Sequence, residues 1–387
     1  MQPRLDDSAT AAGRNGDAGD LLVTGGSGFL GSQFIIAWLD RHPDARAICL
    51  IRADDDAAAS LRLTAALTRA AHDRALDDGL GELLPRAIAI RADLSNIDWL
   101  AQLAERRPGR DAVPLRVVHC AANLSFRAAD REAILGTNVA GTRLMVEAAR
   151  RLGASEFDYV STAYIAGDRD GDILEDDASQ PDAFTNAYEE SKWTAEALVR
   201  SECRADGSRP ALPFRIFRPS IIIGHSITHR LSALSGFYKV AETIEQLGRS
   251  GRVAGETVLL PMPGGATLDL IPVDVVVAEM IALMEAGRPT EGHAFHLTSE
   301  SPLPLVQVLS TLSPLAGFSI DRLPEDAGPA SRLAEALMQR LRHYMPYLGQ
   351  VRRFDRTNVH AAGIRQETVL DVERLRHFVT SFLSRGD

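Results

Sequence analysis

The sequence carries the stretch Thr24-Gly25-Gly26-Ser27-Gly28-Phe29-Leu30-Gly31 directly after the apolar run Leu21-Leu22-Val23. Its glycines at positions 25, 28 and 31 permit a tight turn whose backbone N–H groups can approach a pyrophosphate closely. The pattern from Phe29 to Arg41 predicts a helix, whose N-terminus would add partial positive charge. Strand, glycine-rich turn and helix in this order predict a dinucleotide-binding turn rather than an ordinary loop. The residues expected against the cofactor here are Thr24, Gly25, Ser27, Gly28, Phe29, Leu30 and Gly31.

Apolar strands and helical patterns alternate outward from this turn. We predict strands at 21–24, 47–51, 87–90, 115–120, 157–161 and 214–218, and helices at 29–41, 57–75, 138–152 and 187–203. This alternation is typical of an α/β fold with a Rossmann-type, doubly wound parallel sheet.

The rhythm changes after Gly224. Residues 267–272 and 294–297 are predicted as strands and 273–286 as a helix, so that 266–298 would complete a nucleotide-binding domain of residues 21–223. Residues 224–265 and 299–387 are predicted to form a smaller, mainly helical substrate lobe, with amphipathic helices at 332–345 and 372–383. Residues 1–20, rich in Ala, Gly and Asp, are expected to be a disordered leader.

Composition excludes some classes of function. The chain has 387 residues, of which 45% are hydrophobic, and a net charge of -10 without a basic run, which argues against nucleic-acid binding. Its three cysteines show neither metal-ligand nor disulfide spacing. Without an apolar run long enough to span a membrane, and without a signal peptide, the chain is expected to be a cytoplasmic enzyme that contains no metal.

The residue after the second strand bears on the choice of cofactor. An acid there would accept a hydrogen bond from a ribose 2′-OH, but the strand 47–51 is followed by Arg52, whose guanidinium can pair with a phosphate. This favours NADP(H) over NAD(H), although Arg52 could also be a solvated arginine, and one of the acids at 54–56 could reach the ribose instead. Asp93 and Leu94, just past the third strand, are placed to hold the adenine.

The sequence Tyr188-Glu189-Glu190-Ser191-Lys192 places a tyrosine and a lysine four residues apart on a predicted helix, and therefore on one face. A tyrosine can donate the proton that carbonyl reduction requires if a nearby cation lowers its pKa from about 10. Lys192 is one of only two lysines among 42 basic residues, which makes its position informative. We expect Lys192 to lower the pKa of Tyr188 and to bind the nicotinamide ribose.

A hydroxyl pair at the end of the fifth strand completes the expected catalytic set. Open α/β sheets place their chemistry at the carboxyl ends of the strands, and Thr162 is chosen over Ser161 to polarise the substrate carbonyl. Either hydroxyl could instead satisfy backbone groups. His119, His225 and His296 are interpreted as structural, His119 through packing or through support of the cofactor loop, because no nucleophile or metal partner lies at a recognisable spacing.

These motifs together resemble the extended short-chain dehydrogenase/reductases, and more narrowly the fatty acyl-CoA reductase (male sterility) and thioester reductase branch. The resemblance covers about residues 21–297. The stretches that carry it are Cys49-Leu50-Ile51-Arg52-Ala53, His119-Cys120-Ala121-Ala122, Asn138-Val139-Ala140-Gly141-Thr142, Val160-Ser161-Thr162-Ala163-Tyr164, Ser191-Lys192-Trp193, Phe217-Arg218-Pro219-Ser220 and Ile271-Pro272-Val273-Asp274.

The resemblance implies roles for further residues. Arg52 would hold the 2′-phosphate of NADP, Ala121 and Ala122 would line the cofactor trough, and Asn138 would brace the active site. Pro219 and Ser220 would border the nicotinamide amide. The implied substrate is an acyl thioester on coenzyme A or an acyl-carrier protein, reduced to an aldehyde or alcohol. No adenylation or carrier domain is recognised in the chain, so the acyl group is expected to arrive on another molecule. A monomer or homodimer is expected.

Alternatives remain open at this point. The same scaffold serves NAD(P)-dependent nucleotide-sugar epimerases and dehydratases and other carbonyl reductases, and a binding protein that senses NADP is a further possibility. Arg52 argues against the usually NAD-dependent sugar enzymes, and the set of Thr162, Tyr188 and Lys192 argues against a sensor. For the acyl hypothesis we predict an apolar pocket beneath a lid formed after Gly224, with Phe237 or Tyr238 facing the nicotinamide.

Overall fold

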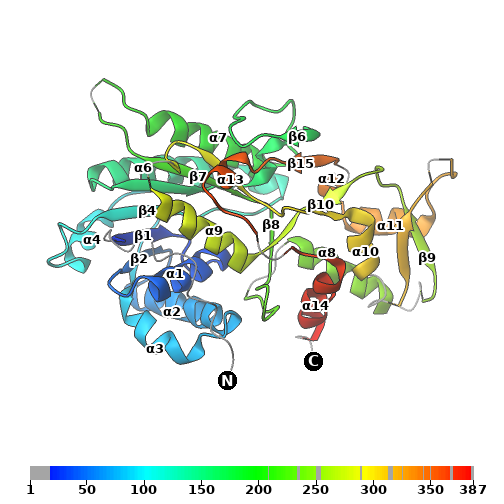
Figure 1. Cartoon of the computed structure of the whole chain (residues 1–387), viewed down its shortest axis with the longest axis horizontal. Coiled ribbons are helices and arrows are strands. Elements are labelled where there is room, and N and C mark those ends of the chain that lie inside the picture. Colours follow the sequence, from blue (N-terminus) through cyan, green and yellow to red (C-terminus); the bar gives the residue numbers. More distant parts are fainter. Residues whose placement is uncertain are drawn as a thin grey trace.

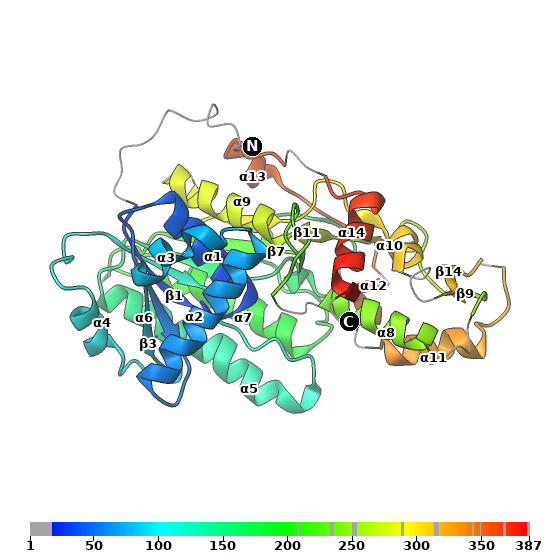
Figure 2. The ribbon, with the colours of Figure 1, turned by 90° about the horizontal axis from the view of Figure 1, so that it is seen from below.

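The computed structural model describes residues 18–207, 209–232, 236–249, 254–287, 290–312, 317–324, 326–342, 344–348, 350–366 and 369–384. Most of the predicted leader, residues 1–17, lies outside this description. Two bodies are visible in Figure 1, a layered sheet body and a lobe beside it, and the view from below in Figure 2 separates them in the same way.

A seven-stranded, fully parallel sheet forms the centre of the sheet body. Its strands are β1 (Asp20–Thr24), β2 (Ala47–Ile51), β3 (Ala87–Arg91), β4 (Leu115–His119), β5 (Glu156–Val160), β7 (Phe214–Pro219) and β12 (Ala294–Leu297). They lie in the order β12-β7-β5-β4-β1-β2-β3. From β1 the strand order runs outward through β2 to one edge and through β4 to the other. The carboxyl ends of β1 and β4 therefore flank the crevice where such folds bind ligands. The predicted α/β, Rossmann-type fold is confirmed.

Helices cover both faces of this sheet. Those of the sheet body are α1 (Phe29–Arg41), α2 (Asp56–Asp73), α3 (Leu80–Leu83), α4 (Leu100–Arg106), α5 (Arg131–Leu135), α6 (Gly141–Arg151), α7 (Ala187–Glu202) and α9 (Val273–Ala286). One apolar core joins the sheet to α1, α2 and α9, and a second joins it to α6 and α7 on the opposite face. β1 and β2, in the interior of the sheet, are buried along their whole length, whereas the edge strand β3 is only partly buried.

The lobe contains helices and short strands. Its helices are α8 (Gly236–Arg249), α10 (Leu305–Leu312), α11 (Arg332–Arg340), α12 (Met345–Leu348) and α14 (Val372–Leu383), which gather beside the sheet body in Figure 2. Its strands are β9 (Thr257–Leu260) paired with β14 (Ser319–Arg322), and β10 (Thr267–Leu268) paired with β13 (Leu303–Pro304). A third core holds these elements together. The lobe is therefore less uniformly helical than the sequence suggested.

Two predicted elements were wrong in extent. The strand predicted at 267–272 is divided at Asp269 into β10 and β11 (Leu270–Pro272), and β11 pairs with β8 (Ile221–Ile223) outside the main sheet. The Asp269 carboxylate accepts hydrogen bonds from the Ser220 hydroxyl and the Ser299 N–H, which holds the chain out of a continuous strand. The helix predicted at 332–345 ends at Arg340, where Leu341 leaves the helical conformation and its N–H makes the last bond, to the carbonyl oxygen of Leu337. A new helix, α12, begins at Met345.

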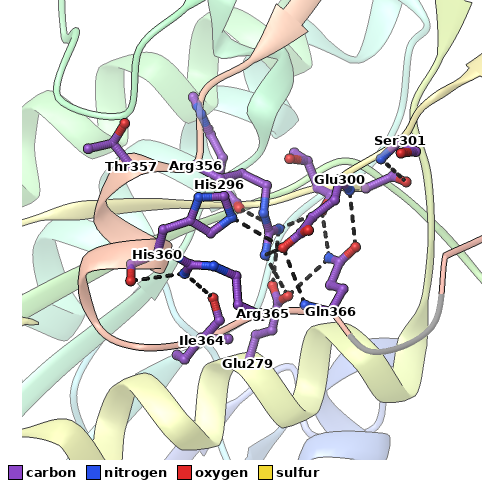
Figure 3. Close-up of polar contacts among 12 residues, drawn as sticks. Glu279, His296, Glu300, Ser301, Arg356, Thr357, His360, Ile364, Arg365 and Gln366 are labelled. Carbon is purple, nitrogen blue, oxygen red and sulfur yellow. Dashed lines mark hydrogen bonds and ion pairs between the residues drawn. The ribbon is translucent and has the colours of Figure 1, made fainter.

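Residues 350–366 leave the lobe and return to the sheet body. There β15 (Arg352–Phe354) pairs with β6 (Gly171–Ile173), and α13 (Thr357–Ala361) packs beside β12. Figure 3 shows Arg356 at the centre of this contact. Its guanidinium donates to the carbonyl oxygen of Thr298 at 2.5 Å and to the Glu279 carboxylate at 2.7 Å, and Gln366 binds the same two groups. We call this cluster the Arg356 clamp.

Two kinds of feature are absent from the part of the chain that the structure describes. There, no helix is both long and apolar enough to cross a membrane. Within the same residues, no group of three or more histidine, cysteine or acidic side chains is arranged to hold a metal ion.

Candidate active site

A cavity of about 1160 Å³ lies along the carboxyl edge of the strands and continues into the lobe. Three groups of residues line it in sequence from the sheet body to the lobe. The first consists of the glycine-rich turn and the ends of β2 and β3, the second of the ends of β4, β5 and β7 with α7, and the third of α8, α10 and α12. Of the described residues that line this cavity, Asp93 alone carries a carboxylate, whereas Arg52, Arg62, Arg127, Lys192 and Lys239 carry positive charge. The cavity is therefore cationic in an acidic protein.

The glycine-rich turn has the geometry that its sequence implies. Gly25 has a φ of +71°, and a Cβ there would lie 2.7 Å from the backbone nitrogen of Ala121. A Cβ on Gly31 would lie 2.3 Å from the carbonyl oxygen of Gly25. The turn thus packs against β4 and against the first turn of α1 at distances that only glycine allows. Gly25, Ser27, Gly28, Phe29, Leu30 and Gly31 all line the cavity, as expected.

Thr24 was expected to contact the cofactor, but it does not line the cavity. Its buried hydroxyl accepts a hydrogen bond from the N–H of Ala121 and contacts Nδ1 of His119 at 2.6 Å. Nε2 of His119 lies 3.0 Å from the hydroxyl of Thr142, which itself donates to the carbonyl oxygen of Asn138. Burial lowers the pKa of His119 to about 3, so the ring is neutral. Thr24 and His119 therefore support the turn from behind, which is the structural role expected for His119.

Two arginines mark the far end of the cavity. Arg52 lines it, and so does Arg62 on α2, which the sequence analysis missed; Arg62 donates to the carbonyl oxygen of Arg52 at 3.0 Å. Asp54, Asp55 and Asp56 are not part of the lining, and Asp55 instead caps α2 by accepting from the N–H of Ala58 at 2.7 Å.

The remaining residues expected at the cofactor line the same cavity. They are Asp93, Leu94, Ala121, Ala122, Pro219 and Ser220. The Ser220 hydroxyl is fixed at 2.5 Å from the carboxylate of Asp269, whose pKa is raised to about 6 by burial. Because a carboxylate only accepts, the Ser220 hydroxyl donates a hydrogen bond to Asp269 and can itself accept one from a group in the cavity.

Tyr188 and Lys192 both line the cavity from one face of α7. The Lys192 ammonium is buried, donates to the carbonyl oxygen of Val160 at 2.5 Å and lies 4.3 Å from the ring centre of Tyr159. Burial lowers the pKa of Lys192 to about 7. Burial and then the Glu189 carboxylate raise the pKa of Tyr188 above its ordinary value, so the expected lowering of this pKa by Lys192 is not observed. The reason is that the ammonium is directed to the end of β5.

Ser161 and Thr162 stand at the end of β5 on the cavity wall. The Thr162 hydroxyl accepts from the N–H of Tyr164 at 3.3 Å and lies 3.4 Å from the carbonyl oxygen of Pro219. The Ser161 hydroxyl is buried and has no hydrogen-bond partner among the described residues. Ser161 is therefore a stronger competitor for the carbonyl-binding role than the sequence indicated, and the choice of Thr162 stays a prediction.

Asn138 lies behind the cavity wall rather than on it. It belongs to a single π-helical turn, residues Gly136–Ala140, a feature that often marks functional sites. Its side chain accepts from the N–H of Asn123 at 2.7 Å and donates to the Ser191 hydroxyl at 2.8 Å. Asn138 thus connects the loop after β4 to α7, which matches the bracing role that the resemblance implied.

Apolar and aromatic side chains form the lobe end of the cavity. They are Phe237, Val240, Leu268, Val308, Leu309, Leu312, Tyr344, Tyr347 and Leu348. Phe237 lines the cavity, and its contact with the nicotinamide stays a prediction. Tyr238 does not line the cavity, because its hydroxyl accepts from the N–H of Gly224 inside the lobe core. Phe126, Tyr344 and Tyr347 also line the cavity but were not among the site residues predicted from the sequence, since they share no local motif with Tyr188.

Comparison with known proteins is consistent with this geometry. A model of the male sterility protein family matches residues 23–280. A carboxylic acid reductase of Segniliparus rugosus is 29% identical over 283 residues, which cover 69% of this chain and 23% of that protein. A putative fatty acyl-CoA reductase of Drosophila melanogaster is 26% identical over 371 residues, which cover 85% of this chain and 64% of that protein. The chain spans about a quarter of the length of the first curated relatives that it matches.

Solved structures share the fold. The terminal R domain from the myxalamid PKS-NRPS pathway superposes with a TM-score of 0.73 at 24% identity, over 96% of this chain and 92% of that domain. The UDP-glucuronic acid 4-epimerase from Bacillus cereus, in complex with NAD, superposes with a TM-score of 0.63 at 18% identity, over 95% and 98% of the two chains. The family match covers the glycine-rich turn, the Tyr188–Lys192 pair and most of the sheet body, with β12 lying beyond it. The chain therefore belongs to the male sterility protein family, an NAD(P)-binding family with the fold of the extended short-chain dehydrogenase/reductases.

Proposed function

We propose that this protein is an NADPH-dependent reductase of acyl thioesters carried on coenzyme A or on an acyl-carrier protein. One observation carries the proposal: a single cavity connects a dinucleotide cradle, the Thr162–Tyr188–Lys192 set and an apolar chamber in the lobe. A thioester substrate needs these three regions in this order, because its carbonyl must meet the cofactor while its acyl chain lies beyond.

The residues of the cavity fit a dinucleotide with an extra phosphate. The turn supplies glycines at close-approach positions, and Arg52 and Arg62 supply two guanidiniums where an NAD-specific site would have an acid. When bound, NADPH would supply the hydride. Ser220, fixed by Asp269, would accept a hydrogen bond from the nicotinamide amide, and Lys192 would bind the ribose hydroxyls.

Two side chains would carry out the remaining steps, which are polarisation of the carbonyl and delivery of the proton. Thr162 would donate a hydrogen bond to the carbonyl oxygen of the substrate, and Tyr188 would deliver the proton to that oxygen. Hydride addition to the thioester carbon and protonation of its oxygen give a hemithioacetal. Its C–S bond then breaks as the hydroxyl proton passes, through Tyr188, to the departing sulfur, so that one hydride and one proton give the aldehyde and the free thiol. Addition of a second hydride and a second proton would give the alcohol.

The apolar lobe favours a thioester over a sugar nucleotide, whereas the positive charge fits the phosphates of either. Arg127 and Lys239 line the cavity in addition to the two arginines of the cradle, and the arms of coenzyme A and of carrier proteins both contain phosphate. A second nucleotide with a sugar would need polar groups where Val308, Leu309 and Leu312 lie. The names of two relatives, carboxylic acid reductase and putative fatty acyl-CoA reductase, also support a reductase of activated acids.

The test is NADPH oxidation by the purified protein with acyl-CoA thioesters of increasing chain length, with products identified by mass spectrometry. We expect aldehyde or alcohol together with free coenzyme A. Tyr188→Phe should lower kcat by about 10² to 10⁴ and nearly keep the affinity for NADPH. Interconversion of nucleotide sugars without net oxidation of cofactor would support the epimerase alternative, and wild-type turnover by the Tyr188→Phe variant would contradict the assigned proton donor.

A further inference from the structure

Tyr347 lies beyond residues 23–280, the part of the chain that the family match covers, yet it contacts the start of the catalytic helix. Its hydroxyl accepts a hydrogen bond from the side-chain amide of Asn186 at 2.7 Å. The Glu189 carboxylate lies near the same hydroxyl: burial raises the pKa of Glu189, and the Tyr347 hydroxyl opposes that rise. Asn186 and Glu189 flank Tyr188 in the sequence.

Asn186 and Glu189 form the N-terminal cap of α7. Asn186 is the cap residue, and its side chain accepts from the N–H of Glu189 at 3.0 Å. Glu189 reaches back and accepts from the N–H of Thr185, also at 3.0 Å. Such reciprocal caps satisfy the orphan N–H groups of the first helical turn and fix the angle at which the chain enters the helix. Tyr188 lies inside this cap, so the cap sets the position of its backbone.

The ring of Tyr347 makes a second set of contacts. It stacks on Phe126 with 5.9 Å between ring centres and meets Tyr164 edge-on at 5.0 Å. Phe126 in turn lies 6.0 Å from the ring of Tyr188. Tyr347 therefore approaches Tyr188 from two directions, through the cap of its helix and through the aromatic wall beside its ring.

The segment that carries Tyr347 is anchored on both sides. The next residue, Leu348, is buried in the lobe core, while β15 and the Arg356 clamp hold the chain beyond it on the sheet body (Figure 3). Tyr344 and Leu348, on either side of Tyr347, line the apolar chamber. Residues 344–348 thus connect the wall of the acyl chamber to the start of α7.

We propose that Tyr347 is a positioning residue for Tyr188, which fixes the start of α7 and so the proton donor relative to the substrate carbonyl. The inference rests on the proposed function for its chemical consequence, but the contact itself is independent of the substrate. It implies that the C-terminal segment, which lies outside the family match, contributes to the active site.

The first test compares Tyr347→Phe with Tyr238→Phe. Tyr347→Phe keeps the ring and removes only the hydroxyl, whereas Tyr238→Phe removes a buried hydroxyl that binds the N–H of Gly224 within the lobe, away from α7. For Tyr347→Phe we expect kcat to fall about tenfold, with the Kd for NADPH changed by less than about twofold, and hydrogen exchange in peptides over 185–192 to accelerate about tenfold. Tyr238→Phe should alter neither kcat nor exchange over these residues.

Unchanged exchange over 185–192 in Tyr347→Phe would overturn the proposal, and so would faster exchange with unchanged kcat, because the contact would then serve the fold alone. A further check adds Tyr347→Phe to Asn186→Ala. In that background the hydroxyl has lost its hydrogen-bond partner at the start of α7, and its removal should lower kcat by much less than tenfold; an equal loss in both backgrounds would also overturn the proposal. If the wild-type protein reduces no acyl thioester, the proposed function fails, and exchange over 185–192 still decides whether Tyr347 holds α7.

Discussion

At the scale of single residues, the cavity places two arginines where the sequence indicated one. Arg62 donates to the carbonyl oxygen of Arg52, so the two side chains lie at the same end of the cradle. The carboxylates at 54–56 do not line the cavity, which removes the alternative that one of them binds the ribose from the cavity wall. The selectivity for NADPH proposed here therefore depends on both guanidiniums.

We predict that Arg52→Ala weakens NADPH binding by about ten- to a hundredfold and leaves NADH binding nearly unchanged, because the lost charge-assisted bonds involve only the 2′-phosphate. Arg62→Ala should have a weaker effect of the same kind. Arg69→Ala, on the same helix as Arg62 but outside the cavity lining, is the matched control. Titration of both cofactors by fluorescence checks this; equal losses for NADPH and NADH would show that Arg52 does not discriminate between them.

Lys192 also has a predicted effect on stability. Burial lowers its pKa in the folded state to about 7, from 10.5, so the unfolded chain binds more protons between these values and stability rises with pH across this window. We predict that Lys192→Met abolishes activity but raises the free energy of unfolding at pH 7 by about 1–3 kcal/mol. This gain should shrink as the pH approaches 10.5.

The other lysine provides the control for this measurement. Lys239 is exposed and pairs with Glu242, so Lys239→Met should leave the free energy of unfolding nearly unchanged at every pH. Denaturant unfolding of both variants at several pH values makes the comparison. A Lys192→Met protein that is less stable than the wild type at neutral pH would mean that the contacts of Lys192 with Val160 and Tyr159 outweigh its desolvation.

At the scale of elements, the helices and strands that the sequence predicted correctly are those with a periodic apolar pattern in their own residues. The strand at 47–51 and the helices at 29–41 and 372–383 have the predicted bounds, because buried strands and amphipathic helices carry periodic apolar signals. The short strands β6, β8, β9, β14 and β15 were missed, since so few residues carry little periodic signal and their pairing depends on distant partners. The site followed the same rule: Tyr188 and Lys192 form a local motif, whereas Tyr347 meets Asn186 across 161 positions of the sequence.

The junction of β1 and α1 gives a test of the glycine-rich turn as an element. A Cβ at Gly31 would lie 2.3 Å from the carbonyl oxygen of Gly25, and backbone atoms cannot yield without opening the turn. We predict that Gly31→Ala abolishes measurable NADPH binding and destabilises the fold by at least about 2 kcal/mol. Gly81→Ala on α3, where no atom lies within 4 Å of the added Cβ, should be neutral. Retained cofactor affinity in Gly31→Ala would contradict the assigned cradle.

At the scale of the whole molecule, the packing assigns the two ends of the cavity to two different parts of the fold. The sheet body provides the cradle and the proton donor, and a separate apolar core builds the lobe around the other end of the cavity. Residues 350–366 return from the lobe to the sheet body, where the Arg356 clamp joins them to β12 and α9 (Figure 3). The lobe is thus tied to the sheet body by chain segments on both sides of the chamber, which fixes the depth of the chamber relative to Tyr188.

The depth of that chamber should set the preferred acyl chain. Val308 and Leu309 of α10 are buried and line its wall, so Val308→Phe should shorten the preferred chain and Leu309→Ala should lengthen it, while neither alters NADPH affinity. Leu305→Ala is the matched control, because Leu305 lies on the same helix and is equally buried but does not line the cavity. It should lower stability by about 2–5 kcal/mol, as a buried leucine truncation does, and leave chain preference unchanged. Values of kcat/KM over a series of acyl-CoA lengths decide the matter: shifts of opposite sign in the two variants place the acyl chain against α10, and identical profiles in all three would place it elsewhere.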